Sequence, residues 1–83
     1  MNKVRVTRKH IKMGMPAAAA SCPIALAVRD YMKGYEYGTI YVDHEYIGIG
    51  PHGFLCPRKV KRFIEAFDAG RPVEPFTFLL RSA

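Results

Sequence analysis

The sequence predicts one α+β domain built on a four-stranded, mainly antiparallel sheet with two helices on one face, in the ferredoxin-like βαββαβ order, plus a short helix after the first strand. Three observations predict this class: two helical stripes of apolar residues, short β-rich segments bounded by glycine and proline, and a length of 83 residues with 49% hydrophobic content. Such a chain can bury one modest core. We therefore expect residues 1–83 to form a single domain.

The first elements are a strand and a short helix. Residues Lys3 to Thr7 alternate between charged and β-branched side chains, a pattern typical of a half-buried strand. Thr7 is a suitable N-cap for one or two helical turns from Arg8 to Met13, which Gly14 would end. Within this short helix we expect His10 to be partly exposed.

Two longer helices carry the clearest periodic pattern. Ser21 can cap the first, Pro23 fits its first turn, and Gly34 supplies its stop. Pro57 opens the second, which ends at Gly70. Apolar residues recur in both at i, i+3, i+4 and i+7, which predicts one buried face per helix. These positions are Ile24, Ala27, Val28 and Tyr31 in the first helix, and Val60, Phe63, Ile64 and Phe67 in the second.

The remaining strands are short. Thr39–Val42 and Tyr46–Ile49 flank a polar turn and predict a hairpin, and Phe76–Leu80 predicts a last strand. Glycines predict an irregular second hairpin arm, with a bulge or a strand end near Gly48, Gly50 and Gly53. Two right-handed crossover units of this kind give the ferredoxin-like order. The alternative is a meander-like sheet that holds the same helices in another order.

The charge distribution is the main functional signal. Thirteen Lys and Arg oppose seven Asp and Glu, for a formal net charge of +6. A helix N-terminus prefers acidic residues, yet the start of the second long helix is basic. Clustered positive charge suits an anionic partner, either nucleic acid or an acidic protein surface, and the alternative is a solvated face that keeps a small domain in solution. The clusters are Lys3, Arg5, Arg8, Lys9 and Lys12, and Arg58, Lys59, Lys61 and Arg62.

Aromatic and histidine residues extend the candidate site. Tyr41 is out of phase with its apolar neighbours, so we expect it on the open face of the sheet beside Lys3 and Arg5. His52, in a glycine-flexible segment, could join the two helix starts to cradle a phosphate or carboxylate. Further tyrosines that could stack on bases are Tyr35, Tyr37 and Tyr46. The expected binding residues are Lys3, Arg5, Arg8, Lys9, Tyr41, His52, Arg58, Lys59, Lys61 and Arg62.

Catalysis, metal binding and cofactor binding are not expected. Cys22 and Cys56 are far apart in sequence and read as reduced packing residues, while the alternative is a cysteine nucleophile at a helix start with His52 or His44 as its base. No zinc-finger spacing, phosphate loop or dinucleotide fingerprint is present. No apolar run approaches membrane length and the N-terminus is charged, so we expect a cytosolic protein without a membrane partner.

A group of short proteins from tailed bacteriophages and prophages resembles this chain over nearly its whole length. The matching residues are Thr7-x-x-His10-Ile11-x-x-Gly14, Cys22-Pro23-Ile24-Ala25-Leu26-Ala27 with Asp30, and Phe63-Ile64-x-x-Phe67-Asp68-x-Gly70-x-x-Val73-x-Pro75-Phe76-x-Phe78. The resemblance implies a protein that binds host machinery, as anti-CRISPR and other anti-defence inhibitors do, and it transfers no catalytic residue.

The leading hypothesis is therefore a phage-type binding protein without enzymatic activity. It would inhibit or modulate a host protein or ribonucleoprotein complex stoichiometrically through its basic clusters. The alternative is an accessory protein that binds DNA or RNA directly, with Lys3, Arg5, Tyr41 and the cluster at 58–62 on the phosphate backbone.

Overall fold

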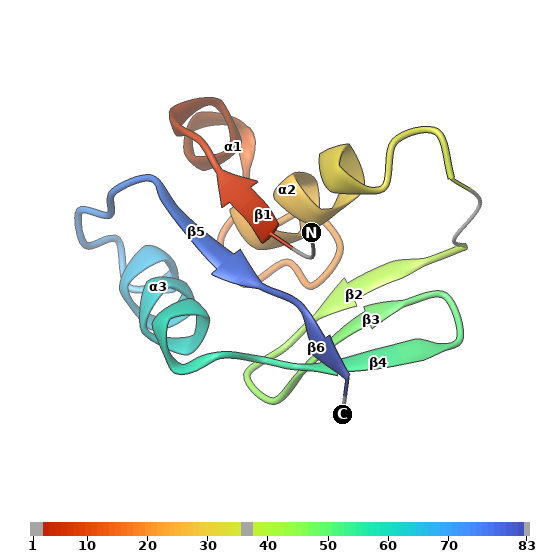
Figure 1. Ribbon diagram of the computed structural model, residues 1–83. Coiled ribbons are helices and arrows are strands. Elements are labelled where there is room, and N and C mark those ends of the chain that lie inside the picture. The colour runs from red at the N-terminus through yellow and green to blue at the C-terminus, as the bar shows by residue number, and fades with distance from the viewer. Residues whose placement is uncertain (1–2, 36–37, 83) are drawn as a thin grey trace.

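The computed structural model describes residues 3–35 and 38–82, which form helices and two antiparallel sheets (Figure 1). The helices are α1 (Arg8–Met13), α2 (Pro23–Tyr31) and α3 (Arg58–Asp68). One sheet pairs β1 (Lys3–Val6) with β5 (Phe76–Leu79). The other is a meander of β2 (Ile40–Val42), β3 (Tyr46–Ile49) and β4 (His52–Leu55), extended at the β4 edge by the short β6 (Arg81–Ser82). The predicted α+β class with antiparallel strands is confirmed.

The C-terminal segment belongs to both sheets. Only Leu80 separates β5 from β6, so the chain leaves one sheet and enters the other within a single residue. The side-chain alternation continues through this junction, because Phe78 and Leu80 are buried whereas Leu79 and Arg81 are exposed. The outer faces of the two sheets therefore form one continuous surface, bent at the strand that both share.

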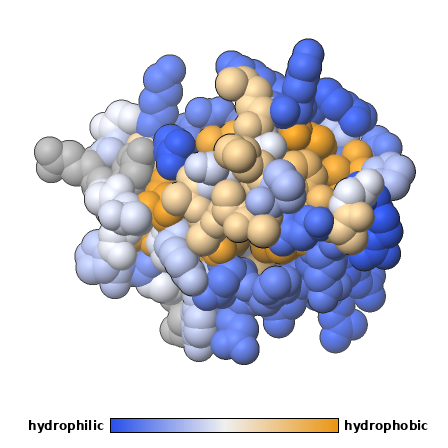
Figure 2. All heavy atoms as spheres, turned by 180° about the vertical axis from the view of Figure 1, so that it is seen from behind, coloured by the Kyte–Doolittle hydropathy of each residue, from blue (hydrophilic) through white to orange (hydrophobic). Residues whose placement is uncertain are grey.

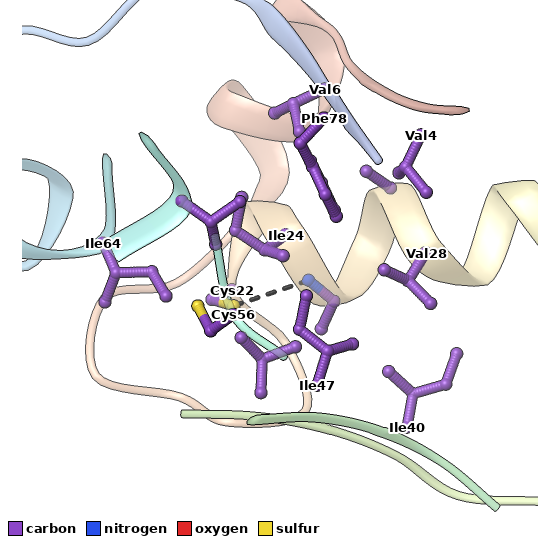
Figure 3. Packing of buried hydrophobic residues seen from close by; sticks show 14 of the residues in the cluster. Val4, Val6, Cys22, Ile24, Val28, Ile40, Ile47, Cys56, Ile64 and Phe78 are labelled. Atoms are coloured by element: carbon purple, nitrogen blue, oxygen red, sulfur yellow. Dashed lines mark hydrogen bonds between the residues drawn. The ribbon is translucent and has the colours of Figure 1, made fainter. Parts of the chain in front are cut away.

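Helix α2 fills the space between the two sheets. It contacts both β1 and β2, and its Ile24 and Val28 side chains are fully buried. Figure 3 shows these two residues between Val4 and Phe78 on one side and residues of the meander on the other. A helix that is apolar on more than one face is stable only where it is covered on those faces, and α2 meets that condition here.

Helix α3 covers one end of this arrangement beside β5 (Figure 1). Its predicted stripe is confirmed, since Val60, Phe63 and Ile64 are buried. The Phe63 ring lies 5.1 Å from the Phe76 ring of β5, centroid to centroid, and 5.9 Å from that of Phe67. These aromatic contacts pack α3 against β5, the strand that continues into the second sheet.

The ferredoxin-like order is not confirmed, and the glycine-rich segment explains why. Gly48 and Gly53 are paired directly in regular antiparallel strands, so the predicted bulge is absent there. The alternative, a strand end, is found at Gly50, which follows β3 and, with φ 58°, begins a two-residue hairpin turn. The extra strand β4 occupies the edge of β3 that β1 would need. Strand β1 pairs with β5 instead, and α2 lies between two sheets rather than beside α3 on one face.

Two helix-end predictions need correction. The N-cap of α2 is Cys22 and not Ser21, since the Cys22 Sγ accepts a hydrogen bond from the Ala25 N–H at 3.4 Å. Gly14 has extended backbone with φ −73°, so its role is not a left-handed stop. A Cβ at Gly14 would lie 2.5 Å from the Pro23 Cδ, which explains why a glycine stands there.

His10 is buried, contrary to the expectation of partial exposure. Its Nδ1 accepts a hydrogen bond from the Thr7 N–H at 3.0 Å, and its Nε2 lies 2.6 Å from Asp30 Oδ2 on α2. The Thr7 side chain in turn accepts from the His10 N–H, which completes a capping box. The imidazole therefore caps α1 and joins it to α2.

Candidate functional site

The outer surface of the two sheets is positively charged. The chain has seven Asp and Glu, and none lies in a strand of the part that the structure describes. Three basic residues do lie in strands: Lys3 and Arg5 in β1 and Arg81 in β6. All three are exposed. The strands therefore present cations to solvent without carboxylates between them.

Exposed apolar side chains lie among these cations. Leu55 is 50% exposed and Leu79 is 44% exposed. The strand register places Leu55 opposite Arg81 and Leu79 opposite Lys3, with Tyr46 on the far side of Leu55. Directly opposed residues on one face of an antiparallel pair are neighbours. The result is a continuous row in which apolar and basic side chains alternate.

A groove of about 610 Å³ opens next to this row. It lies where β5 diverges from the end of β4 and the start of α3. Its basic lining residues are Lys3, Lys59 and Arg81, and its other lining residues are Leu55, Cys56, Pro57, Thr77, Phe78 and Leu79. Among the residues that the structure describes, no Asp or Glu lines it. We call this feature the β5–α3 groove.

Lys59 is held across the β5–α3 groove. Its Nζ donates a hydrogen bond to the Thr77 carbonyl oxygen at 2.9 Å, which links the first turn of α3 to β5. That first turn contains no acidic residue, and Pro57 provides no side-chain cap. An ammonium group has three N–H donors, so Lys59 keeps donors for an anion in the groove.

Two predicted basic residues line a second, shallower depression. Arg5 and Arg8 border a space of about 320 Å³ beside Pro75 and Phe76. The Arg8 guanidinium is 3.2 Å from Glu74 Oε1, and both side chains are largely exposed. A nearby carboxylate lowers the local potential, so Arg8 contributes less to the basic surface than Arg5 does.

Tyr41 does not lie on the same sheet as Lys3 and Arg5. It is 51% exposed on the outer face of β2 and lines a depression of about 260 Å³ next to residues 17–19. Tyr41 and Tyr46 do share a sheet face, because Tyr41 pairs with Gly48, two residues along β3 from Tyr46. The prediction placed Tyr41, Lys3 and Arg5 on the open face of one sheet, whereas the structure divides them between the outer faces of two sheets.

The predicted anion cradle at the helix starts is not formed. His52 begins β4 next to the hairpin turn, at the opposite end of that strand from Leu55. It is therefore separated from the start of α3. The remaining predicted residues are exposed and line none of these three depressions: Lys9, Arg58, Lys61 and Arg62. Tyr35 is exposed beyond α2, and Tyr37 lies outside the described residues.

The two cysteines are free, buried and close together in the core (Figure 3). Burial raises the pKa of Cys56 from 9.0 to about 11 and also raises the pKa of Cys22. The thiolate is the nucleophilic form of cysteine, so both thiols are protonated and weakly reactive at neutral pH. Among the described residues, no group of three or more His, Cys, Asp and Glu side chains could hold a metal ion.

Apolar exposure occurs on more than one side of the molecule. Figure 2 shows an apolar area at the centre of the face opposite to the view of Figure 1, bordered by hydrophilic side chains. Met13 and Met15 are 64% and 60% exposed. Exposure alone therefore does not define a site, whereas the combination of exposed leucines and basic side chains at the β5–α3 groove does. None of the described helices has both the length and the apolar character required of a membrane span.

Sequence reasoning missed Leu55, Leu79 and Arg81. The sequence does contain a pattern that points to Leu79 and Arg81. Together with Thr77 they alternate with buried residues, so these three residues share one face. Nothing in the sequence places Leu55 opposite Arg81, since that pairing depends on the order of the strands.

Comparisons with protein-family models, with curated proteins and with solved structures found no match. Several residues on which the expected resemblance was based have structural roles. Thr7, His10 and Asp30 join α1 to α2, Gly14 allows the close approach of Pro23, and Asp68 Oδ1 accepts the Ala17 N–H at 2.9 Å. These residues secure the connection between α1 and α2.

Proposed function

We propose that this protein is a phage-type, non-enzymatic binding protein that inhibits or modulates a host complex, such as a CRISPR or other defence complex, in the host cytoplasm. It acts stoichiometrically through the outer surface of its two sheets. One observation carries the proposal: strand cations lie beside exposed leucines and tyrosines on a surface whose strands hold no carboxylate. Unpaired charge next to exposed apolar groups is typical of an interaction surface.

The chemistry of the core supports a binding role over a catalytic one. A cysteine nucleophile needs a lowered pKa, and the pKa of Cys56 is raised to about 11 instead. His52 is also at the far end of β4 from Cys56. The pairing of Cys56 with His52 therefore has no support in the arrangement of these groups. His44 and Cys22 line the same depression, but burial raises the pKa of the Cys22 thiol as well.

A second candidate function is direct binding of single-stranded nucleic acid. Tyr41 and Tyr46 are about half exposed on one sheet face, and Gly48 and Gly53 beside them carry no side chain that would block access to the rings. Exposed aromatic rings on a sheet stack with unpaired bases, and nearby cations bind the phosphates. This candidate uses the meander face more than the β5–α3 groove.

Matched charge reversals test the proposal. The triple variant Lys3→Glu, Arg5→Glu and Arg81→Glu removes the strand cations, and Lys12→Glu, Lys33→Glu and Arg71→Glu lowers the net charge equally at exposed positions outside the strands. In quantitative pull-downs from host lysate, the first variant should lose the partner and the second should retain it. Equal retention by both variants would contradict the proposed surface.

Salt dependence separates the two candidates. Single-stranded RNA and DNA are titrated with the wild-type protein at two salt concentrations, using fluorescence anisotropy. Binding that weakens about tenfold or more per threefold rise in salt, and that is lost in Tyr41→Ala, would favour the nucleic-acid function. Retention of a protein partner after nuclease treatment, without affinity for either oligonucleotide, would favour the inhibitor.

A further inference from the structure

We infer that the β5–α3 groove binds an acidic peptide segment of the partner and accepts one large apolar side chain of that segment. This inference rests on the proposed function, because it assigns a partner chemistry to the same surface. The groove combines an apolar interior with a basic rim, and each part of that combination selects a feature of the ligand.

The interior of the groove is apolar. Leu55 and Leu79 are about half exposed at its walls, Pro57 lies between them and α3, and the buried Phe78 forms its floor. Its volume of about 610 Å³ exceeds what one side chain needs and is in the range of pockets that bury a ligand. Filling the groove removes leucine surface from water, and hydrophobic burial of this kind favours an aliphatic or aromatic side chain.

The rim supplies charge complementarity. Lys3, Lys59 and Arg81 border the groove, and none of its described lining residues is Asp or Glu. The Lys59 ammonium is already fixed by the Thr77 carbonyl, so its position does not have to be ordered when a ligand binds. Carboxylates that flank an inserted apolar side chain would meet these cations on both sides of the groove.

The same features disfavour nucleic acid as the occupant. Bases stack chiefly on aromatic rings, and the exposed rings of Tyr41 and Tyr46 do not line the groove. Among its described lining residues, a single guanidinium, that of Arg81, could stack with a base. The exposed walls of the groove are leucine and proline. An acidic peptide with a bulky apolar residue fits these walls better than a nucleotide does.

The leucines make a direct test possible. The chain contains only four leucines, and Leu55 and Leu79 line the groove whereas Leu26 and Leu80 do not. The probe is a short acetylated peptide of Glu and Asp with a central Phe, added to protein labelled at its leucine methyl groups for NMR. We expect saturable shifts of the Leu55 and Leu79 methyls, and little shift of Leu26.

Matched peptides test each half of the inference. Replacing the central Phe by Ala, or all acidic residues by their amides, should weaken binding about tenfold or more. Equal binding of all three peptides, or shifts confined to residues outside the groove, would overturn the inference. Dodecanoate and oligo(dT) are added as competing probes, and stronger shifts of the Leu55 and Leu79 methyls by either one would also overturn it.

Variants separate this inference from the proposed function. Leu79→Ala should weaken the peptide and the captured host partner about tenfold, while Met13→Ala, at an exposed apolar position outside the groove, should leave both unchanged. Leu55→Ala repeats the test if Leu79→Ala unfolds. Host capture that depends on the strand cations but not on either leucine would overturn the groove and leave the proposed function standing. If the variant without the strand cations captures the host partner as well as wild type does, the proposed function is wrong. The peptide titration then still tests the groove.

Discussion

A single imidazole connects the first two helices. Because His10 Nδ1 accepts the Thr7 N–H, the proton of the neutral imidazole is on Nε2, which donates to Asp30. The side chain is only 8% exposed, so water cannot fully replace these bonds. His10, in the third position of α1, thus accepts the N–H of the N-cap residue, which Glu or Gln accepts in most capping boxes.

Replacing His10 therefore should destabilise the fold. His10→Ala removes the capping bond and the link to Asp30, and we expect a loss of about 1–3 kcal/mol in the free energy of unfolding. His10→Gln can still accept from the Thr7 N–H and should lose less. Urea denaturation of both variants measures the difference. A His10→Ala protein as stable as wild type would contradict the assigned role.

The buried thiols predict a loss of stability at alkaline pH. The pKa of Cys56 is raised to about 11 in the folded chain, against 9.0 when solvated, because burial disfavours the thiolate. Its contribution is thus fully present below pH 9 and is lost as the pH rises from 9 toward 11. Denaturant titrations between these pH values should show a steeper fall for wild type than for Cys56→Ala. An equal fall in stability with pH for both proteins would contradict the raised pKa of Cys56.

At the scale of elements, the start of α3 is less stable than its length suggests. Arg58 opens the helix, no acid lies in its first turn, and Pro57 gives no side-chain cap. The partial positive charge of the helix N-terminus repels these cations. Lys59 differs from Arg58, because its bond to the Thr77 carbonyl offsets part of that repulsion.

This difference predicts opposite effects of two neighbouring substitutions. Arg58→Glu should raise the free energy of unfolding by about 0.3–1 kcal/mol at low salt, and less at high salt. Lys59→Glu gains the same helix interaction but loses the bond to Thr77, so it should be neutral or destabilising. Thermal denaturation at two salt concentrations measures both effects. Stabilisation by Lys59→Glu equal to that by Arg58→Glu would show that the bond to Thr77 contributes nothing.

The two longer helices could be predicted from the sequence because apolar residues recur in each at helical spacing. The short strands could be located for the same reason, by alternation. Strand β4 could not, because Gly48 and Gly53 carry no side chain to alternate, so the segment reads as irregular although both glycines are regularly paired. Which strands pair depends on contacts distant in sequence, and the hairpin at Gly50 decided that order.

At the scale of the whole molecule, the candidate site depends on that strand order. The basic character of Lys3 and Lys59 could be predicted from the sequence, but their shared groove with Arg81 could not. Lys3 and Lys59 are far apart in the chain. They line the same groove because β5 pairs with β1, which carries Lys3, and also contacts the first turn of α3, which carries Lys59. Composition therefore predicted the chemistry of the surface, and the topology determined which charges lie together.

The shared C-terminal strand should also make the two sheets unfold together. Leu80 is 5% exposed at the junction of β5 and β6, whereas its neighbour Leu79 is 44% exposed on the outer face. Leu80→Ala removes buried contacts and should cost about 2–4 kcal/mol, while Leu79→Ala should cost less than about 1 kcal/mol.

Native-state hydrogen exchange tests whether the two sheets are coupled. In a single cooperative unit, Leu80→Ala lowers the protection of the most stable amides in β1 and β5 and in β3 and β4 by the same free energy. Leu79→Ala serves as the matched control and should leave protection nearly unchanged in both sheets. A loss of protection in only one sheet would show that the sheets are separate folding units, and that the β5–α3 groove is held by local contacts such as the Lys59–Thr77 bond.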